Sequence, residues 1–126
     1  ITGDGSMQIN IQELDTLNRL NLDVSIIVMN NEVLGMVKNF QDMYFDGRDQ
    51  STRKGYSSPS FTDIALAYGI AAHRVGSAAD IERTLPLIAG HKGPLLIEVM
   101  MEGATESRPR LTFGSKLDEQ FPKLNI

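Results

Sequence analysis

The sequence predicts an α/β domain in which a mostly parallel β-sheet lies between two layers of helices. Three apolar runs of strand length, at Val24–Met29, Ile70–Val75 and Leu95–Met101, alternate with segments of helical periodicity. These runs are almost continuously apolar, which is typical of parallel strands that are buried on both faces. The length of 126 residues allows one such domain.

The first half of the chain predicts a strand, a helix and a second strand. Ile1-Thr2 fits the end of a strand, and the residues from Met7 to about Asn21 fit a helix. The apolar face of this helix comprises Ile11, Leu14, Leu17 and Leu20. About 14 helical residues rise roughly 21 Å, and a strand of about six residues covers roughly 20 Å. The chain therefore returns to its starting level, and both strands end at the same carboxyl edge, where open α/β sheets bind ligands.

The second half predicts two further helices and two further strands. Phe61–Tyr68 fits a short helix ended by Gly69, and Ile70–Val75 fits the strand that follows. The next helix runs from Ser77, its cap, to about Ala89, and we expect Pro86 to shorten or kink it.

The last predicted strand, Leu95–Met101, contains Glu98 in an otherwise apolar run, so we expect this carboxylate at the edge of the sheet or paired. Residues 102–126 then form a tail that is rich in charge and turns. Within the tail, Arg108-Pro109-Arg110 and Leu117–Pro122 are candidates to pack on another domain or to cover an active site. An extended arm without chemistry is the commoner fate of a terminal segment.

Two short polar motifs follow the first two strands. Gly3-Asp4-Gly5 follows the first strand, and Asn30-Asn31 follows the second. Carboxylate and amide oxygens are ligands that Mg²⁺ accepts, and glycine lets the backbone approach an anion closely. Each motif alone is a common turn. Together, at one sheet edge, they predict a metal-diphosphate site, with the amides of Gly5 and Ser6 directed at the phosphates. Ser6 could alternatively be a plain N-cap.

These motifs carry a family resemblance. The run Gly3–Leu14 and the run Asn30–Val37 are similar to thiamine diphosphate-dependent enzymes, and specifically to the large subunit of acetolactate (acetohydroxyacid) synthase. The specific match extends to roughly Arg48 and the weaker pattern to about Met101. The resemblance implies a Rossmann-like, three-layer thiamine diphosphate-binding fold that is incomplete at its N-terminus. Residues 1–101 would be the C-terminal part of the diphosphate-binding (PP) domain, and residues 102–126 would be the tail.

The resemblance also implies roles for individual residues. Asp4 and Asn31 would bind Mg²⁺ through their side chains, and Val33 through its backbone carbonyl. The residues lining the cofactor would be Gly3, Asp4, Gly5, Ser6, Asn31, Val33, Leu34, Gly35 and Met36. The glutamate that activates the cofactor lies in this family on a separate pyrimidine-binding domain from another subunit. We therefore expect no catalytic residue on this chain, which would be inactive alone.

The implied reaction is the decarboxylation of pyruvate or another 2-keto acid and the ligation of the product to a second carbonyl, as in branched-chain amino acid biosynthesis. The cofactors would be thiamine diphosphate and Mg²⁺, and any FAD would sit elsewhere in the full-length enzyme. We expect a homodimer or homotetramer. Two alternatives stay open: another thiamine diphosphate-dependent 2-keto acid decarboxylase or oxidase, and a cofactor-binding domain without catalysis.

Two segments depart from the synthase pattern. Phe40 stands where the synthases usually carry a tryptophan that shapes the pocket for the second keto acid. Phe40 is thus a candidate substrate-pocket residue, although its helical spacing from Leu34 and Val37 also fits a place in the core. The polar stretch between Tyr44 and Ser60 is expected to stay out of the core, as a mobile loop near the cofactor or as an ordinary surface loop.

Composition excludes several classes of partner. The chain carries 12 basic and 16 acidic side chains, with a net charge of −4, and it has no long basic run, so nucleic acid and anionic membranes are unfavoured partners. It has no cysteine and no apolar run long enough to span a membrane. We expect a cytoplasmic protein. His73 and His91 lack spaced partner residues and are expected to be incidental.

Overall fold

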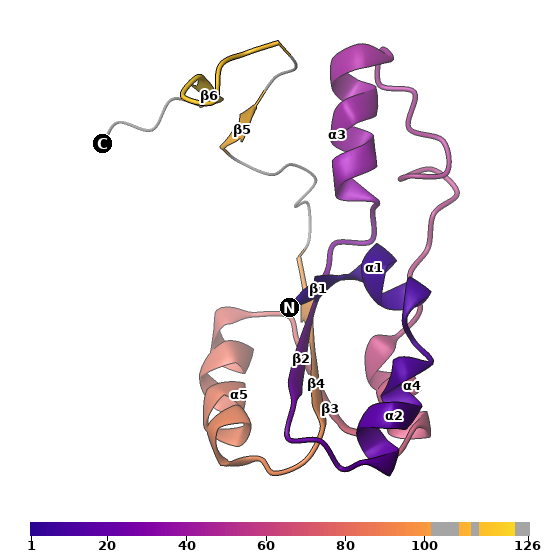
Figure 1. Cartoon of the computed structure of the whole chain (residues 1–126), viewed down its shortest axis with the longest axis vertical. Coiled ribbons are helices and arrows are strands. Elements are labelled where there is room, and N and C mark those ends of the chain that lie inside the picture. The colour runs from indigo at the N-terminus through magenta and orange to yellow at the C-terminus, as the bar shows by residue number, and fades with distance from the viewer. Residues whose placement is uncertain (102–108, 112–113, 123–126) are drawn as a thin grey trace.

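A four-stranded parallel sheet organises the chain, whose computed structural model describes residues 1–101, 109–111 and 114–122 (Figure 1). The strands are β1 (Thr2–Gly3), β2 (Ser25–Asn30), β3 (Ala71–Val75) and β4 (Leu95–Met100), in the order β1-β2-β4-β3. All three neighbouring pairs are parallel. The central strands are therefore β2 and β4, which the sequence shows as its most apolar runs.

Helices cover both faces of this sheet. On one face lie α1 (Asp4–Ile9), α2 (Glu13–Arg19) and α4 (Phe61–Ala67), and on the other lies α5 (Ala78–Gly90) (Figure 1). Helix α3 (Gly35–Tyr44) stands clear of the sheet, beyond the edge at which β2 ends (Figure 1). The predicted three-layer α/β fold with a parallel sheet is confirmed. A short antiparallel pair, β5 (Arg110–Leu111) and β6 (Gln120–Phe121), belongs to the tail.

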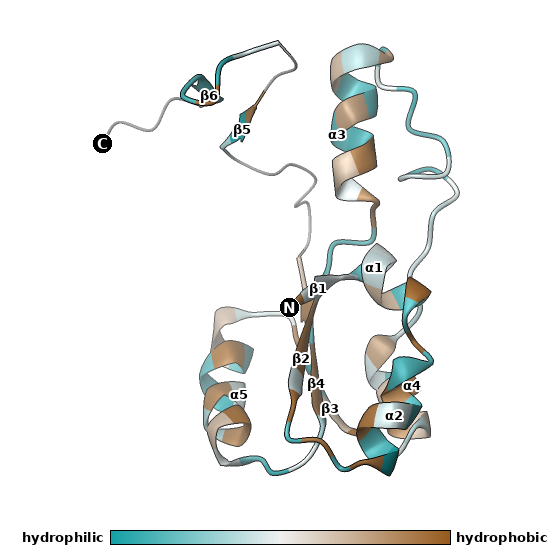
Figure 2. Cartoon of the chain, in the orientation of Figure 1, coloured by the Kyte–Doolittle hydropathy of each residue, from teal (hydrophilic) through white to brown (hydrophobic). Residues whose placement is uncertain are grey.

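Each face of the sheet has its own apolar core, because successive strand residues point to opposite sides. The core beneath α1, α2 and α4 consists of Met7, Leu14, Val28, Phe61, Ala65, Ile70 and Leu96. The core beneath α5 consists of Val75, Leu95 and Ile97. The central strands β2 and β4 are accordingly mostly apolar (Figure 2). On β4 and β2 the residues Glu98 and Asn30 share the first face with Leu96 and Val28, which places two polar side chains in an apolar layer.

The prediction of one helix from Met7 to about Asn21 is wrong. The chain forms two helices separated by a turn at residues 10–12, and the first of them already begins at Asp4. Asn10 ends α1, and its side-chain amide donates to the carbonyl of Ser6 over 3.3 Å. Asparagine side chains compete in this way with the backbone ladder of a helix. The turn leaves Leu20 of the predicted apolar face 52% exposed, whereas Leu14 is buried.

The elements of the second half lie where the sequence predicts them, with one correction, at Pro86. Gly69 follows α4 with φ of +76°, and the Ser77 hydroxyl accepts from the Asp80 amide at the start of α5. Pro86 does not shorten α5, which continues to Gly90. Glu98 is not at the sheet edge, because β4 is central; it is paired, as the other half of that prediction states.

The described part of the tail contacts α3. Arg110 donates to the side-chain oxygen of Asn39, and its guanidinium lies 5.8 Å from the centre of the Phe121 ring. Leu117 is 82% exposed, and Arg108 lies outside the described residues. Within residues 1–101, 109–111 and 114–122, no helix is both long and apolar enough to cross a membrane.

Candidate functional site

The two polar motifs of the sequence meet at the carboxyl edge of β1 and β2. Thr2 pairs with Val28 and Gly3 with Met29, so Asp4 continues β1 at the level where β2 reaches Asn30. The segment after β2 then packs against the start of α1. A β-carbon on Gly5 would stand 2.5 Å from Cδ2 of Leu34, so any side chain at this position would have to displace the Leu34 side chain. The predicted placement of Gly3-Asp4-Gly5 and Asn30-Asn31 at one carboxyl edge of the sheet is thus present in the fold.

Asp4 is a buried carboxylate held by a tyrosine. Asp4 is only 3% exposed, and its Oδ2 accepts a hydrogen bond from the Tyr56 hydroxyl over 3.1 Å. Gln8 Nε2 donates to the same hydroxyl over 3.0 Å. Burial, together with the charge of Asp4 and the hydrogen bond to it, raises the pKa of Tyr56 to about 12. Tyr56 therefore keeps its proton at neutral pH and remains a donor to Asp4.

A tight turn connects β2 to α3. Oδ1 of Asn30 accepts from the Glu32 amide over 3.1 Å, and Oδ1 of Asn31 accepts from the Val33 amide over 3.3 Å. Glu32 has φ of +54°, a left-handed conformation that few non-glycine residues adopt. The Leu34 amide donates to the carbonyl of Thr52 over 2.9 Å, which fixes the start of α3. Both asparagines thus use their side chains to shape this turn.

The polar stretch before α4 lies against these strand ends. Tyr56 contacts Asp4, and the Ser58 hydroxyl donates to Oδ1 of Asn30 over 3.0 Å. We refer to Asp4, Asn30, Tyr56 and Ser58 as the strand-end cluster. One segment of chain therefore bridges the ends of both strands.

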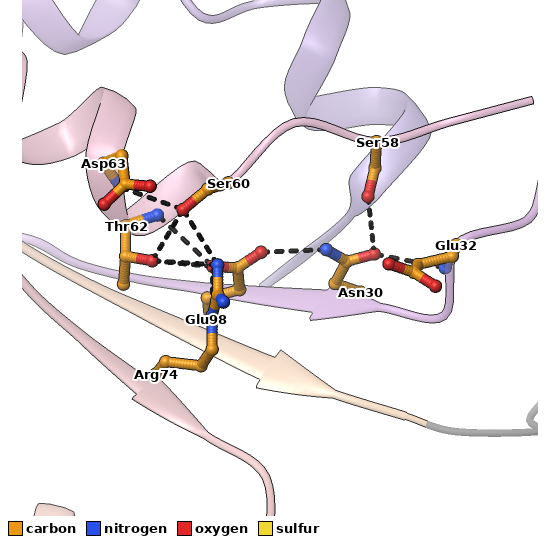
Figure 3. A network of polar contacts seen from close by, with 8 residues as sticks. All are labelled: Asn30, Glu32, Ser58, Ser60, Thr62, Asp63, Arg74 and Glu98. Carbon is orange, nitrogen blue, oxygen red and sulfur yellow. Dashed lines mark hydrogen bonds and ion pairs between the residues drawn. The ribbon is translucent and has the colours of Figure 1, made fainter.

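Beneath the cluster, a network of polar contacts centres on the buried carboxylate of Glu98 (Figure 3). Its Oε1 accepts from Asn30 Nδ2 over 2.8 Å. Its Oε2 accepts from the Thr62 hydroxyl over 2.9 Å and from Nη2 of Arg74 over 3.0 Å. Burial alone would raise the pKa of Glu98, but the hydrogen bonds from Asn30, Thr62 and Arg74 outweigh it and hold the pKa below its ordinary value. Glu98 is therefore a charged carboxylate at neutral pH.

The remaining predicted site residues lie around this edge. Gly3 is the N-cap of α1, and Gly5 and Ser6 are in its first turn, so the alternative of Ser6 as N-cap is wrong. Val33 is buried, and Leu34 and Gly35 begin α3. First-turn amides of a helix have no partner within it, so those of Gly5 and Ser6 are of the kind that an anion can use.

Two predicted residues lie on the exposed part of α3. Met36 is 74% exposed and Phe40 is 39% exposed. The ring of Phe40 lies 4.8 Å from that of Tyr44 and 5.7 Å from that of Phe45. Phe40 is therefore part of a surface aromatic group and not of either core of the described chain, so the core alternative is wrong. Its role in a substrate pocket stays a prediction.

The sequence missed the contribution of the segment between Tyr44 and Ser60. The segment supplies no residue to either described apolar core, as the sequence predicts, yet its polar residues Asp49 and Thr52 are buried, with 6% and 5% exposure. The Thr52 hydroxyl donates to Gln41 Oε1 over 2.6 Å and so joins this segment to α3. The one available signal is Tyr56, an aromatic residue in an otherwise polar run. Its pairing with Asp4 spans 52 positions and has no local sequence pattern.

The donor set fits a hard cation. Asp4, Asn31 and Val33 offer a carboxylate oxygen, an amide oxygen and a backbone carbonyl, and Mg²⁺ completes such partial sets with phosphate and water oxygens. Asn31 already accepts a hydrogen bond, but an amide oxygen has two lone pairs. The described residues contain no group of three or more His, Cys, Asp or Glu side chains that could hold a metal, so any cation here depends on this mixed set.

Comparison with known proteins gives one consistent result. The family model for the thiamine pyrophosphate enzyme, C-terminal TPP binding domain, matches residues 1–99. An acetolactate synthase of Arthrospira platensis is 35% identical over 114 residues, which cover 90% of this chain and 20% of that protein. The large subunit of acetolactate synthase isozyme 2 from Escherichia coli (strain K12) is 31% identical over 125 residues, 99% of this chain and 23% of that protein.

A solved structure shares the fold. The thiamine diphosphate-dependent 4-hydroxybenzoylformate decarboxylase of Rhodococcus jostii RHA1 has a TM-score of 0.72 and 26% sequence identity, covering 79% of this chain and 19% of that chain. The chain thus spans about a fifth of the length of the relatives it matches.

Proposed function

The chain belongs to the family of C-terminal thiamine pyrophosphate-binding domains, and we propose that it holds thiamine diphosphate through Mg²⁺ in an acetolactate synthase-like enzyme. The observation that carries this proposal is the packing of Gly5 against Leu34 beside the buried Asp4. It brings an acidic side chain, a glycine-lined backbone and the turn of Asn31 to the carboxyl edge of a parallel sheet, where ligands of such folds bind.

Each residue has a distinct part in holding the cofactor. Asp4, Asn31 and the carbonyl of Val33 would bind Mg²⁺, which in turn would bind the diphosphate. Amides in the first turn of α1 would donate to phosphate oxygens. Tyr56 donates to Oδ2 of Asp4 and so leaves Oδ1 for the metal. Thiamine diphosphate, when bound, supplies the carbanion chemistry that decarboxylates a 2-keto acid, and the protein supplies position and charge.

We also propose that the catalytic unit needs a second protein surface. Exposed apolar residues gather on α3 and just after it, namely Met36, Val37, Phe40, Tyr44 and Phe45. Contiguous apolar side chains on a surface favour contact with another protein surface. A pyrimidine-binding domain of another subunit would cover this face and bring the activating glutamate, in a homodimer or homotetramer. The chain alone would then bind cofactor weakly and turn over no substrate.

A second candidate reaction is simple decarboxylation of a 2-keto acid. Phe40 takes the place of the tryptophan that synthases of this type usually carry, and the protein of similar fold from Rhodococcus jostii is named as a decarboxylase. A different side chain at the acceptor pocket changes which second carbonyl fits there.

Cofactor binding and product analysis test both candidates in the full-length protein. Titration with thiamine diphosphate, with Mg²⁺ or with EDTA, should show binding that requires the metal. Incubation with pyruvate should then yield acetolactate, whereas acetaldehyde as the main product would favour the decarboxylase. Binding that is absent, or indifferent to Mg²⁺, would contradict the proposed function in either form.

A further inference from the structure

Glu98 is a buried charge in the middle of an apolar strand. The residue has 0% exposure and lies on the central strand β4, between the hydrophobic residues Ile97 and Val99. Its countercharge is Arg74 on the neighbouring edge strand, whose side chain is 50% exposed. The carboxylate loses its hydration while the guanidinium stays half-exposed, so the cost of burying Glu98 offsets much of what the ion pair contributes to stability. The position of this carboxylate therefore points to a role beyond holding the sheet together.

The two oxygens of Glu98 serve different partners. Oε2 faces Thr62 and Arg74, which contribute backbone, hydroxyl and guanidinium donors. Oε1 accepts a hydrogen bond from Asn30 Nδ2 over 2.8 Å, and within the described residues it has no other hydrogen-bond donor. Because a carboxylate can only accept, Asn30 must turn its NH₂ group toward Glu98. The amide oxygen of Asn30 must then point the opposite way.

The opposite side of Asn30 shapes the turn that carries the proposed metal ligands. Its Oδ1 accepts from the Glu32 amide and from the Ser58 hydroxyl (Figure 3). The first bond holds Glu32 in its left-handed conformation, between Asn31 and Val33. An Asn30 amide rotated by half a turn would present NH₂ to the Glu32 N–H, and two donors cannot bond to each other.

We propose that Glu98 is a positioning residue that fixes the orientation of the Asn30 amide and, through it, the turn that offers Asn31 and Val33 to Mg²⁺. This inference rests on the proposed function. Groups that orient metal ligands from behind govern metal affinity as well as geometry. Glu98 itself does not touch the metal or the cofactor in this scheme.

Exchange of the acid and the amide tests the proposal. In Glu98→Gln, the new amide can accept the hydrogen bonds from Thr62 and Arg74 only if its oxygen faces them. Its NH₂ group then faces Asn30. Asn30 must then rotate, and the bond to the Glu32 amide is lost. In Asn30→Asp, two carboxylates face each other. The double variant combines both exchanges. Its carboxylate at position 30 accepts from the amide at position 98, from the Glu32 amide and from Ser58, so every hydrogen bond returns and the net charge is unchanged.

The readout is Mg²⁺-dependent binding of thiamine diphosphate to the full-length protein, measured by titration calorimetry without substrate. We expect each single variant to bind about 10- to 100-fold more weakly than the wild type. We expect the double variant to return to the wild-type range. If a single variant yields no folded protein, recovery of folded, cofactor-binding protein in the double variant supports the proposal equally. A double variant that binds no better than the singles overturns it.

Thr62→Val is the matched control. It removes one donor to Oε2 of Glu98 but leaves the contact between Oε1 and Asn30 intact. It should lower the melting temperature without weakening cofactor binding. Equal weakening by Thr62→Val and Glu98→Gln would mean that general stability, not orientation, matters, and would overturn the proposal. If the wild type does not bind thiamine diphosphate, the proposed function is contradicted. If the wild type binds and Glu98→Gln binds equally well, only the role of Glu98 is contradicted.

Discussion

The carboxyl edge of β1 and β2 and the helix α3 that follows it are built in opposite ways. At the edge, Asp4 and Asn30 are 3% and 2% exposed, and each is held by side chains from distant parts of the chain. On α3, apolar side chains such as Met36 and Val37 face outward instead. The chain therefore orders the strand ends with its own contacts, whereas the apolar side chains of α3 stay exposed.

The largest loss of stability is expected from a substitution at Met7. This residue of α1 is 5% exposed and belongs to the apolar core between the sheet and helices α1, α2 and α4. Met7→Gln removes apolar contacts and buries an amide, so the free energy of unfolding should fall by about 2–5 kcal/mol. Urea denaturation measures this. A loss as small as that of a surface substitution would show that α1 is not part of a packed core.

A clash at the meeting point of the two motifs should have the next largest effect. The β-carbon of Gly5→Val would lie 2.5 Å from Leu34 Cδ2 and would push that side chain aside, so we expect a loss of about 1–3 kcal/mol in unfolding free energy. Gly3→Ala is the control for folding, because a β-carbon there meets nothing within 4 Å. Equal melting temperatures for both variants would argue against the close approach of Gly5 to Leu34.

Removal of the tyrosine hydroxyl should have a smaller effect. Tyr56→Phe deletes the donor to Asp4 and leaves that buried carboxyl group short of a partner. A fully buried hydrogen bond to a charged group contributes about 1.5–3 kcal/mol. Because Tyr56 is only half-buried, we expect the free energy of unfolding to fall by less than that. Thermal unfolding gives the loss. An unchanged melting temperature would mean that water replaces Tyr56 at Asp4 without penalty.

Acid should weaken the edge through Glu98. Because its pKa is lower in the folded chain than its ordinary value of 4.5, the stability it contributes is fully present above that value. This stability is lost as the pH falls through the lowered pKa. Urea denaturation gives the free energy of unfolding of the wild type and of Glu98→Gln at each pH. The difference between the two proteins should therefore shrink as the pH falls. A difference in unfolding free energy that does not change with pH would contradict the charged state assigned to Glu98.

The smallest effect is expected on the exposed helix. Met36 is 74% exposed, so Met36→Gln should change the free energy of unfolding by less than about 0.5 kcal/mol. It makes the same chemical change as Met7→Gln, and the pair isolates burial as the variable. A large loss from Met36→Gln would show that α3 is already covered by the protein under test.

The sequence predicts the fold well where short-range pattern determines it. The apolar runs at β2, β3 and β4 identify the strands, and Ser77 and Gly69 mark helix ends by local chemistry. The break in the first helix escaped prediction because Asn10 acts through a side-chain bond to Ser6 that periodicity does not register.

The candidate site divides in the same way. The shared sheet edge of Asp4 and Asn31 could be predicted because a helical segment between two apolar runs indicates parallel strands that end together, although that segment is two short helices and not one. Tyr56, Ser58 and Thr62 could not, because their partners lie 52, 28 and 36 positions away and the register of a loop against a sheet leaves no periodic trace. Glu98 is intermediate, since an acid in an apolar strand predicts a partner without naming it.

Asp4→Ala tests the central claim most directly, with Asp15→Ala on the exposed surface of α2 as the control. Titration of the full-length proteins with thiamine diphosphate in the presence of Mg²⁺ is the measurement. We predict that Asp4→Ala loses most of the cofactor affinity while its far-ultraviolet circular dichroism stays that of the wild type, and that Asp15→Ala binds normally. Unchanged affinity in a folded Asp4→Ala protein would contradict the assignment of this strand end as the Mg²⁺-diphosphate site.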